Sequence, residues 1–436
     1  MNNRTSLGDL GYTWDANKNK TSESITGVMS GYGFTSAGTT YDNEDRLTGF
    51  SRAATSGPAL LSQSWSLTSV GDWTSVTTNG TAQSRTHGPT HELLTAGGQN
   101  VATDVKGNIT TLPANLRPTG ATTAMNLTWD SDNKLRSADI DANGTADVNF
   151  QYDALGRRVA RSGTGGSVVY VQMEQQTIAD YPVGGAATTP TFRYVYASYI
   201  DEPVVRKNAG TGGTLVYFHR NHQYSITAMT TSTGAVAERY AYTAYGQPTI
   251  LDASGTVLPT SNFSIRTSYT GREWDATLGL HHFRARWMSP SAGRFIVRDP
   301  AVFFDGPNIY SFLRSKAVLG ADPSGMWTEV RSICQFSYTP CNIELVGETC
   351  YCTFEIRKQC ITGRRDNDSL PNHNDGWHYW LPFHRYEDST EYEQELPVDY
   401  CGSCREMMLP EPVLPIAFQF LDDSGWVRLP DPPSVS

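Results

Sequence analysis

The chain has 436 residues and a formal net charge of −10, with 34 Lys and Arg against 44 Asp and Glu. This acidic balance argues against binding to nucleic acid, because phosphate backbones would be repelled. No apolar run approaches the ~20 residues that span a bilayer, and segment 1–20 lacks the apolar centre of a secretory signal. We therefore expect no membrane span, and either a protein that is not secreted by the classical route or a chain that lacks the N-terminus of a longer protein.

Charge and cysteine are distributed unevenly along the chain. Residues 1–326 carry 26 basic and 26 acidic side chains, whereas 327–436 carry 8 and 18, and all seven cysteines lie in the second segment. The many Gly, Ser, Thr, Asn and Tyr residues favour short strands joined by turns over helices. We predict an all-β protein with a domain boundary near residue 326.

A degenerate repeat occupies the first 160 residues. Its frame is an aromatic residue, an Asp, two or three polar residues, a Gly or Asn, a basic or polar residue, and an alternating strand, with one copy missing or unrecognisable between 42 and 104. The copies are TWDANKNKT from Thr13, YDNEDRLTGF from Tyr41, TDVKGNITTL from Thr103, TWDSDNKLRSA from Thr128 and YDALGRRVARS from Tyr152.

Each copy predicts a β-hairpin. An Asp side chain bonds the backbone of its own turn, and Gly or Asn tolerates the positive φ that a tight turn needs. The aromatic residue before the Asp is expected to contact the neighbouring hairpin. One hairpin cannot bury its own face, so the units are expected to stack in series.

Residues 139–147 read DIDANGTAD and lie between two repeats. The oxygen ligands Asp139, Asp141, Asn143 and Asp147 have the spacing of an EF-hand calcium loop, but Phe150 stands where the bidentate acid belongs. We favour a hairpin turn here and keep calcium as the alternative.

Four motifs follow in order near residue 300: TGREWDATLGLHHFRARWM from Thr270, GRFIVRDP from Gly293, NIYSFLR from Asn308 and DPSGM from Asp322. With YDALGRRVARS and the Tyr-rich segment 215–248, they resemble the RHS (rearrangement hotspot) or YD-repeat family and its RHS-repeat-associated core domain. The resemblance covers most of residues 12–327.

The resemblance implies a β-sheet wound spirally into a hollow shell, which the core domain caps while a variable C-terminal segment is held inside. A chain of this length would form only part of such a shell. The domains implied are degenerate repeats over 1–214, the RHS core over 215–326, and a small cysteine-rich acidic domain over 327–436.

The resemblance also implies an aspartyl-type self-cleaving protease. The positions that match are Arg286, Asp299 and Asp322, and the bond cut would be Met326–Trp327. Two carboxylates can hydrolyse a peptide bond when one holds a proton, and a nearby guanidinium favours ionisation of the other.

The first DPxG element departs from the family pattern because it reads Asp299-Pro300-Ala301-Val302. Val is expected to need a negative φ where Gly would not, so the turn that holds Asp299 would be altered. The alternative is therefore a core domain that only caps the shell. By the resemblance, Arg272, Arg284 and Arg294 are expected to be pairing residues in the internal polar networks of the family.

The C-terminal segment matches no toxin family by its residues, and three interpretations stay open. Seven cysteines in 110 residues favour a disulfide-bearing domain with one odd thiol. Cys401 and Cys404 have the spacing of a zinc knuckle. His378 and His384 lie among aromatic residues and acids, as in an enzyme active on a target cell, although no known catalytic motif is present.

We therefore predict an RHS-repeat protein that encloses or presents a C-terminal effector of the polymorphic-toxin kind, released by cleavage after Met326. The alternative is a structural or carbohydrate-contacting surface protein without cleavage. The expected partners are its own C-terminal segment as cargo, an immunity protein and upstream shell segments. The expected location is secreted or at the cell surface, and no cofactor is required, with calcium or zinc as options.

Overall fold

A computed structural model describes residues 7–326 except 33, 54–58, 119, 198 and 210–212, and beyond them it describes the strands that lie between 330 and 428. The chain divides into two compact units, Met1–Trp327 and Thr328–Ser436. Strands dominate the described residues, and every helix among them is a short 3-10 helix. Three-residue to five-residue 3-10 segments are η1 (Val28–Tyr32), η2 (Ala114–Leu116), η3 (Tyr269–Gly271), η4 (Val302–Asp305) and η5 (Leu313–Ser315).

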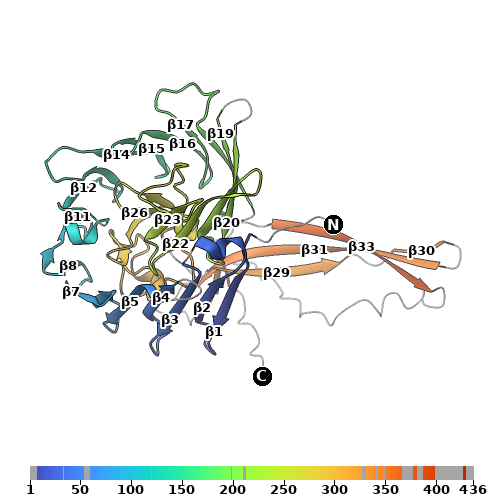
Figure 1. Cartoon of the computed structure of the whole chain (residues 1–436). Coiled ribbons are helices and arrows are strands. Elements are labelled where there is room, and N and C mark those ends of the chain that lie inside the picture. The colour runs from blue at the N-terminus through green and yellow to red at the C-terminus, as the bar shows by residue number, and fades with distance from the viewer. Residues whose placement is uncertain are drawn as a thin grey trace. The chain divides into compact units, whose positions relative to one another are not determined.

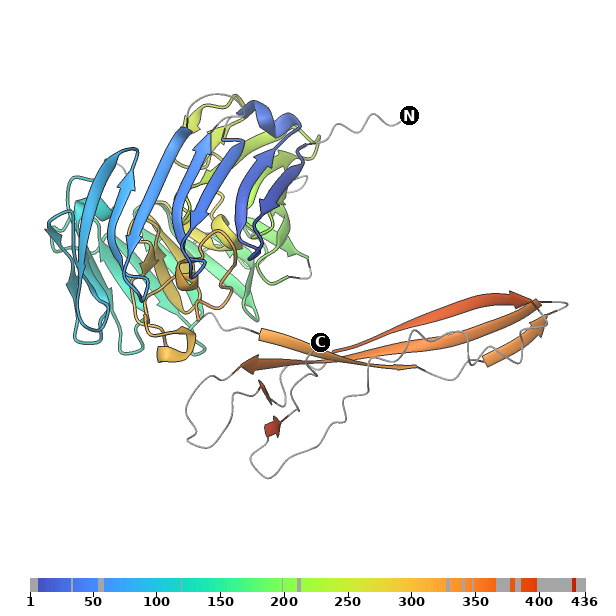
Figure 2. The ribbon, with the colours of Figure 1, turned by 90° about the horizontal axis from the view of Figure 1, so that it is seen from below.

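The strands of the first unit pair with their neighbours in sequence order and run antiparallel (Figures 1 and 2). The nine-stranded sheet contains β1 (Leu10–Trp14), β2 (Lys20–Ile25), β3 (Ser36–Tyr41), β4 (Leu47–Ala53), β5 (Ala59–Leu67), β6 (Trp73–Thr78), β7 (Thr81–His87), β8 (Leu93–Ala96) and β9 (Gln99–Asn100). The fifteen-stranded sheet contains β10 (Ala102–Thr103), β11 (Ile109–Leu112), β12 (Met125–Trp129), β13 (Leu135–Asp139), β14 (Val148–Tyr152), β15 (Arg158–Gly163), β16 (Val168–Met173), β17 (Gln176–Tyr181), β18 (Phe192–Tyr196), β19 (Pro203–Asn208), β20 (Leu215–Arg220), β21 (Ile226–Thr231), β22 (Val236–Tyr242), β23 (Pro248–Asp252) and β24 (Val257–Leu258). The prediction of an all-β protein with large antiparallel sheets is confirmed.

The turns of all five predicted repeats share one geometry. In each, one oxygen of the Asp side chain accepts the backbone N–H groups two and four residues later, at 2.8–3.0 Å. The residue three positions after the Asp has positive φ in every copy, which explains why Gly or Asn is frequent there. The Asp residues are Asp15, Asp42, Asp104, Asp130 and Asp153.

The aromatic residue before the Asp also joins consecutive hairpins. Tyr41 donates its hydroxyl hydrogen to the carbonyl of Lys20 at 2.7 Å, and Trp129 donates Nε1–H to the carbonyl of Ile109 at 2.8 Å. These bonds span 21 and 20 residues, so each aromatic residue contacts the hairpin before its own. The contact predicted from the sequence is confirmed, and it is polar as well as apolar.

Between 42 and 104, where the sequence predicts one missing or unrecognisable copy, two turns have the backbone bonding of the repeat turns. One is closed by Thr68, whose hydroxyl accepts the N–H of Asp72 at 3.0 Å, with Gly71 at a φ of +84°. In the other, Gly88 starts the turn and His91 takes a φ of +70°. Sequence reasoning missed both because neither turn begins with Asp.

The two large sheets, β1–β9 and β10–β24, together form a curved wall. The first strand of this wall contacts a turn more than 200 residues later in the chain. The Tyr12 ring in β1 lies 4.6 Å from the ring of His222, which follows β20, and the N–H of His222 donates to the Tyr12 hydroxyl at 3.3 Å. The sheet then continues inward: all seven residues of β22 are buried, and Arg52 of β4 donates to the carbonyl of Tyr242 at 3.0 Å. A strand buried on both faces lies between layers.

Residues 259–326, which follow β24, fill the space between the curved sheets and are called the enclosed segment below (Figure 1). They form a four-stranded sheet and irregular segments that contribute to both large hydrophobic clusters, through Phe283 and Phe312 on one side and Trp287 and Ile296 on the other. The Trp287 ring lies 5.0 Å from that of Phe150 in the wall. The four strands are β25 (Glu273–Asp275), β26 (Leu280–Phe283), β27 (Arg286–Ser289) and β28 (Arg294–Phe295).

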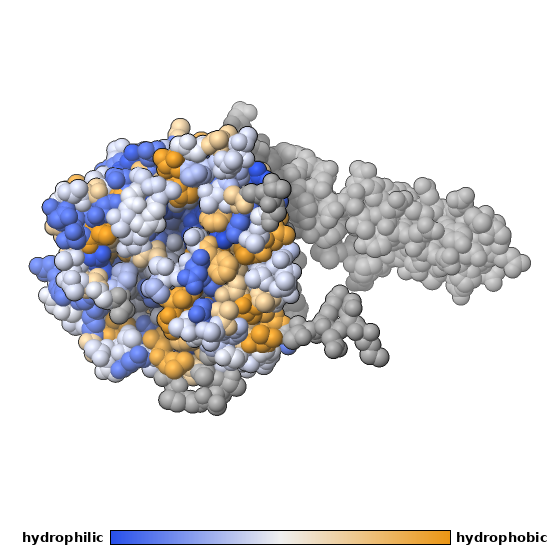
Figure 3. Space-filling model, turned by 45° about the horizontal axis from the view of Figure 1, so that its top comes forward, coloured by the Kyte–Doolittle hydropathy of each residue, from blue (hydrophilic) through white to orange (hydrophobic). Residues whose placement is uncertain are grey.

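Hydrophilic and hydrophobic residues are intermixed on the face of the first unit that Figure 3 presents.

The second unit has a six-stranded sheet ordered β29-β31-β32-β34, with β30 and β33 also paired to β31. Among the described residues, no helix is both long and apolar enough to cross a membrane. The strands of the second unit are β29 (Val330–Tyr338), β30 (Asn342–Val346), β31 (Thr349–Arg365), β32 (Trp377–Trp380), β33 (Tyr386–Pro397) and β34 (Trp426–Arg428).

Candidate functional site

Arg286 opens β27 directly after a two-residue turn formed by Arg284 and Ala285. Every residue of β26 and β27 is buried, so this guanidinium is enclosed, with the residue only 1% exposed. Its central carbon lies 3.6 Å from the centre of the Phe295 ring, which supports a cation–π contact. A cation held this far from water needs anionic partners.

Asp299 is the first of these partners. Its N–H bonds the carbonyl of Ile309 at 2.9 Å, and its Oδ1 accepts the N–H of Ala301 at 2.8 Å, which orients Oδ2 toward Arg286 at 2.9 Å. The expectation that Val302 would need a negative φ is wrong, because its φ is +55°. The turn therefore keeps a left-handed residue without Gly, at the cost of backbone strain in a β-branched residue.

Asp322 is the second partner and is fully buried. Its Oδ1 accepts the N–H groups of Gly325 at 2.9 Å and Met326 at 3.2 Å. Gly325 has a φ of +71° and lies against the carbonyl of Phe283, where an added Cβ would approach to 2.0 Å. Only glycine fits this turn without displacing the β26–β27 hairpin.

The three predicted residues meet at one guanidinium nitrogen of Arg286. It lies 2.9 Å from Asp299 Oδ2 and 3.5 Å from Asp322 Oδ2, while Nε of Arg286 donates to the carbonyl of Gly325. Burial raises the pKa of Asp322, and the Asp299 charge adds to that rise although Arg286 and the Gly325 N–H oppose it. Two buried carboxyl groups beside a peptide segment, one of them with a raised pKa, suit acid–base chemistry. Met326 ends the described segment, and Trp327 lies outside it.

A cavity of about 520 Å³ adjoins the turn that contains Asp322. Its lining includes Pro300, Ser324 and Met326 from the enclosed segment and Gln175 and Ile200 from the wall. Water in such a cavity would be next to the peptide that follows Gly325.

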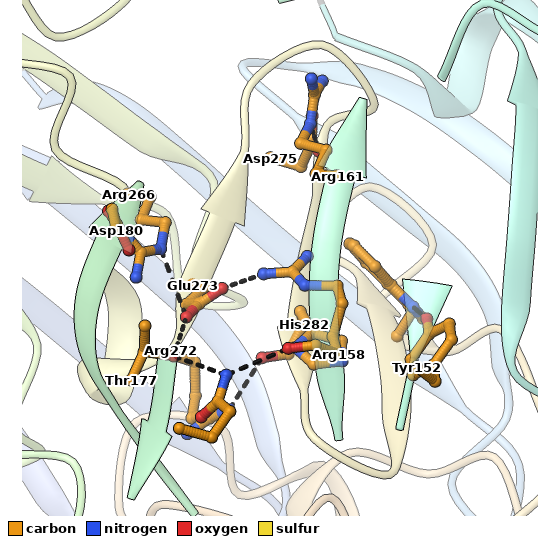
Figure 4. A network of polar contacts seen from close by, with 12 residues as sticks. Tyr152, Arg158, Arg161, Thr177, Asp180, Arg266, Arg272, Glu273, Asp275 and His282 are labelled. Atoms are coloured by element: carbon orange, nitrogen blue, oxygen red, sulfur yellow. Dashed lines mark hydrogen bonds and ion pairs between the residues drawn. The ribbon is translucent and has the colours of Figure 1, made fainter. Parts of the chain in front are cut away.

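A second polar network joins the enclosed segment to the wall (Figure 4). Glu273 of β25 forms ion pairs with Arg158 of β15 and with Arg266, whose Nε lies 3.3 Å from Oε1, and it accepts a hydrogen bond from the Thr177 hydroxyl at 3.3 Å. Burial alone would raise the pKa of Glu273, but the guanidinium groups of Arg266 and Arg158 outweigh it and hold that pKa well below its usual range.

Sequence reasoning found part of these networks. The predicted pairing of three arginines is confirmed, since Arg272 and Arg284 contact Asp201 and Arg294 contacts Asp72. It missed Asp201, which lies in a wall turn and carries no sequence signal.

It also missed Asp180 and its partner Arg266. Asp180 is an acid with a buried side chain in the strand Gln176–Tyr181, and a charged residue at an inward position was the available signal.

The predicted calcium ligands form a hairpin turn. Carboxylate oxygens of Asp139, Asp141 and Asp147 lie within 4.8 Å of one another. However, the N–H groups of Asn143 and Gly144 already bond Asp139, and the Asn143 amide bonds Asp141 and the N–H of Thr145. These contacts account for the turn, and calcium stays a prediction. Cys401 and Cys404, the predicted zinc pair, lie outside the described residues.

No protein-family model matches the chain. Among curated proteins, the chain is 26% identical over 210 residues to the tRNA3(Ser)-specific nuclease WapA of Bacillus spizizenii. The aligned region covers 46% of this chain and 8% of that protein. It is 37% identical over 93 residues to the toxin subunit YenC2 of Yersinia entomophaga, covering 21% and 9%. The chain thus spans less than a tenth of either relative. The solved structure TcdB2-TccC3-Cdc42 matches with a TM-score of 0.38 and 17% identity, over 75% of this chain and 20% of that one.

Proposed function

The chain is homologous to RHS/YD-repeat proteins, and we propose that its first unit is a partial RHS shell with a core that cuts the chain after Met326 to free the C-terminal segment. The observation that carries this proposal is the convergence of Asp299 and Asp322 on Arg286, beside the peptide that leads to Met326.

The reaction is hydrolysis of the Met326–Trp327 peptide bond by one water molecule. Asp299 takes a proton from the water, whose oxygen forms a bond to the Met326 carbonyl carbon. Protonated Asp322 gives its proton to the Trp327 nitrogen as the C–N bond breaks, leaving a carboxylic acid on Met326 and an amine on Trp327; the acid then passes its proton to the amine. The raised pKa of Asp322 supports its assignment as the acid.

The substrate belongs to the same fold, which removes the entropy cost of binding it. Asp322 Oδ1 and Arg286 Nε both bond the turn that precedes the cut. A peptide held in this way reacts at high effective molarity, so a modest catalyst suffices for one turnover.

We propose the segment from Trp327 onward as the released effector, with an immunity protein as its partner and a secreted or cell-surface location. Two observations support this: one relative is named a tRNA nuclease and another a toxin subunit, and this segment differs from the first unit in charge and cysteine content.

The test is the intact mass of the purified full chain. Self-cleavage predicts a 110-residue fragment beginning at Trp327, absent from Asp299→Asn and from Asp322→Asn. Glu44→Gln is a control, since Glu44 is an exposed wall residue paired with Arg46. If the wild-type chain stays a single species over days, the proposal fails and a capping core without cleavage is favoured.

A further inference from the structure

The turn that precedes the cut is held by three consecutive residues of the β26–β27 hairpin. Arg284 donates its NH1 hydrogen to the carbonyl of Pro323, the N–H of Ala285 donates to Ser324 at 3.2 Å, and Arg286 donates to Gly325. Two of these donors are side chains. Arg286 belongs to the proposed catalytic group, whereas the side chain of Arg284 contacts Asp201 and the carbonyls of Gln175 and Pro323.

Arg284 also binds the wall. Its NH2 lies 2.7 Å from Asp201 Oδ1, its NH1 lies 3.2 Å from Asp201 Oδ2, and its Nε donates to the carbonyl of Gln175 at 3.0 Å. Gln175 lies in the turn between β16 and β17, and Asp201 lies between β18 and β19. One guanidinium thus joins two consecutive wall hairpins to the turn at the cut.

Asp201 is itself held firmly. Its side chain is 2% exposed, and Arg272 NH1 lies 2.6 Å from Oδ1. Gly271, at a φ of +71°, packs on the Asp201 backbone so closely that a Cβ would meet its carbonyl oxygen at 2.1 Å. A fixed carboxylate can orient a guanidinium through two parallel bonds, which a lysine cannot reproduce.

From these contacts we infer that Arg284 is a positioning residue for self-cleavage, which makes the cut depend on docking of the wall hairpins at Gln175 and Asp201. The inference rests on the proposed cleavage after Met326. Without the wall, Arg284 loses its anchors, and the carbonyl that water attacks moves relative to Asp299 and Asp322. A misplacement of about 1 Å costs on the order of 100-fold in rate.

The test measures the rate at which newly synthesised full chain is converted to the 326-residue fragment. Arg284→Met removes the donors at similar length, and Arg284→Lys keeps the charge. Arg157→Met is the matched control, because Arg157 also bonds an Asp and a turn carbonyl of the wall, at Asp153 and Glu174.

We expect Arg284→Met to cleave about 100-fold more slowly than Arg157→Met, with Arg284→Lys in between and the pH dependence of the rate unchanged. Both Met variants should still be fully folded in the absence of urea and unfold in one cooperative transition, which separates positioning from loss of fold. Asp201→Asn should slow cleavage similarly, and its effect should not add to that of Arg284→Met. Equal rates in Arg284→Met and Arg157→Met would overturn the inference.

A second readout does not need cleavage. In the Asp299→Asn chain, hydrogen exchange of the Gly325 and Met326 amides should be at least 10-fold faster with Arg284→Met than with Arg157→Met, because Asp322 would no longer hold them in place. If the wild-type chain does not cleave but these amides respond in this way, the proposed function falls and the positioning role of Arg284 stands. Equal exchange in both variants would refute the positioning role.

Discussion

Glu273 offers a sharp test of how the enclosed segment is attached to the wall. Glu273→Gln is isosteric, so it opens no cavity and leaves the charges of Arg158 and Arg266 without the carboxylate that they share. Removing one member of a buried ion pair costs about 3–5 kcal/mol. Among the described residues, Arg158 loses its ion-pair partner in this variant, but Arg266 keeps its contact with Asp180. Because one of the two arginines stays paired, we expect a loss of unfolding free energy at the lower end of this range, about 3 kcal/mol.

The assay is urea unfolding of the full chain at pH 7, monitored by its tryptophan fluorescence. The matched control is Glu44→Gln, which makes the same chemical change at a side chain that is 63% exposed and 3.2 Å from Arg46. An exposed pair contributes at most about 1 kcal/mol. The difference between the two variants therefore isolates the effect of burial.

The pH dependence gives an independent check. The folded pKa of Glu273 lies below that of the unfolded chain. Its contribution is therefore complete above about pH 4.5 and is lost as the pH falls toward the folded pKa. The gap between wild type and Glu273→Gln should be largest near neutral pH and should shrink below pH 4.5. A variant that unfolds with the Glu44→Gln midpoint, or a gap that grows on acidification, would refute the role of the shared carboxylate.

Three further predictions concern the candidate site. Cleavage should slow as the pH rises through the folded pKa of Asp322, because that raised pKa keeps the acid protonated only below it; a rate that rises over the same range would contradict this. Gly325→Ala should abolish cleavage and destabilise more than Gly234→Ala, measured by urea unfolding, since both have a left-handed φ but only Gly325 lies against a carbonyl. Val302→Gly should raise the free energy of unfolding by up to about 1 kcal/mol, because relief of a strained φ exceeds the entropy cost of Gly, while Val302→Ala should change little.

The hairpins could be predicted from the sequence because everything that closes them lies within five residues. Asp15 and Asp153 bond N–H groups two and four positions later, and such a turn forms in any chain with that local pattern. Thr68 and Gly88 close similar turns with other chemistry, and there the pattern fails. The family resemblance added the order of the motifs and the residues that meet at Arg286.

Tertiary structure alone decided which distant residues meet. Glu273 and Arg158 are 115 positions apart, and Arg284 and Asp201 are 83 apart. Which of them come into contact depends on how far the wall has curved when it passes the enclosed segment. That curvature is the sum of many strand twists and bulges, to which each residue contributes a little. The sequence by itself determined the repeated turns and the all-β class, whereas the ion pairs that tie the wall to the turn before Met326 exist only once the sheet has closed around it.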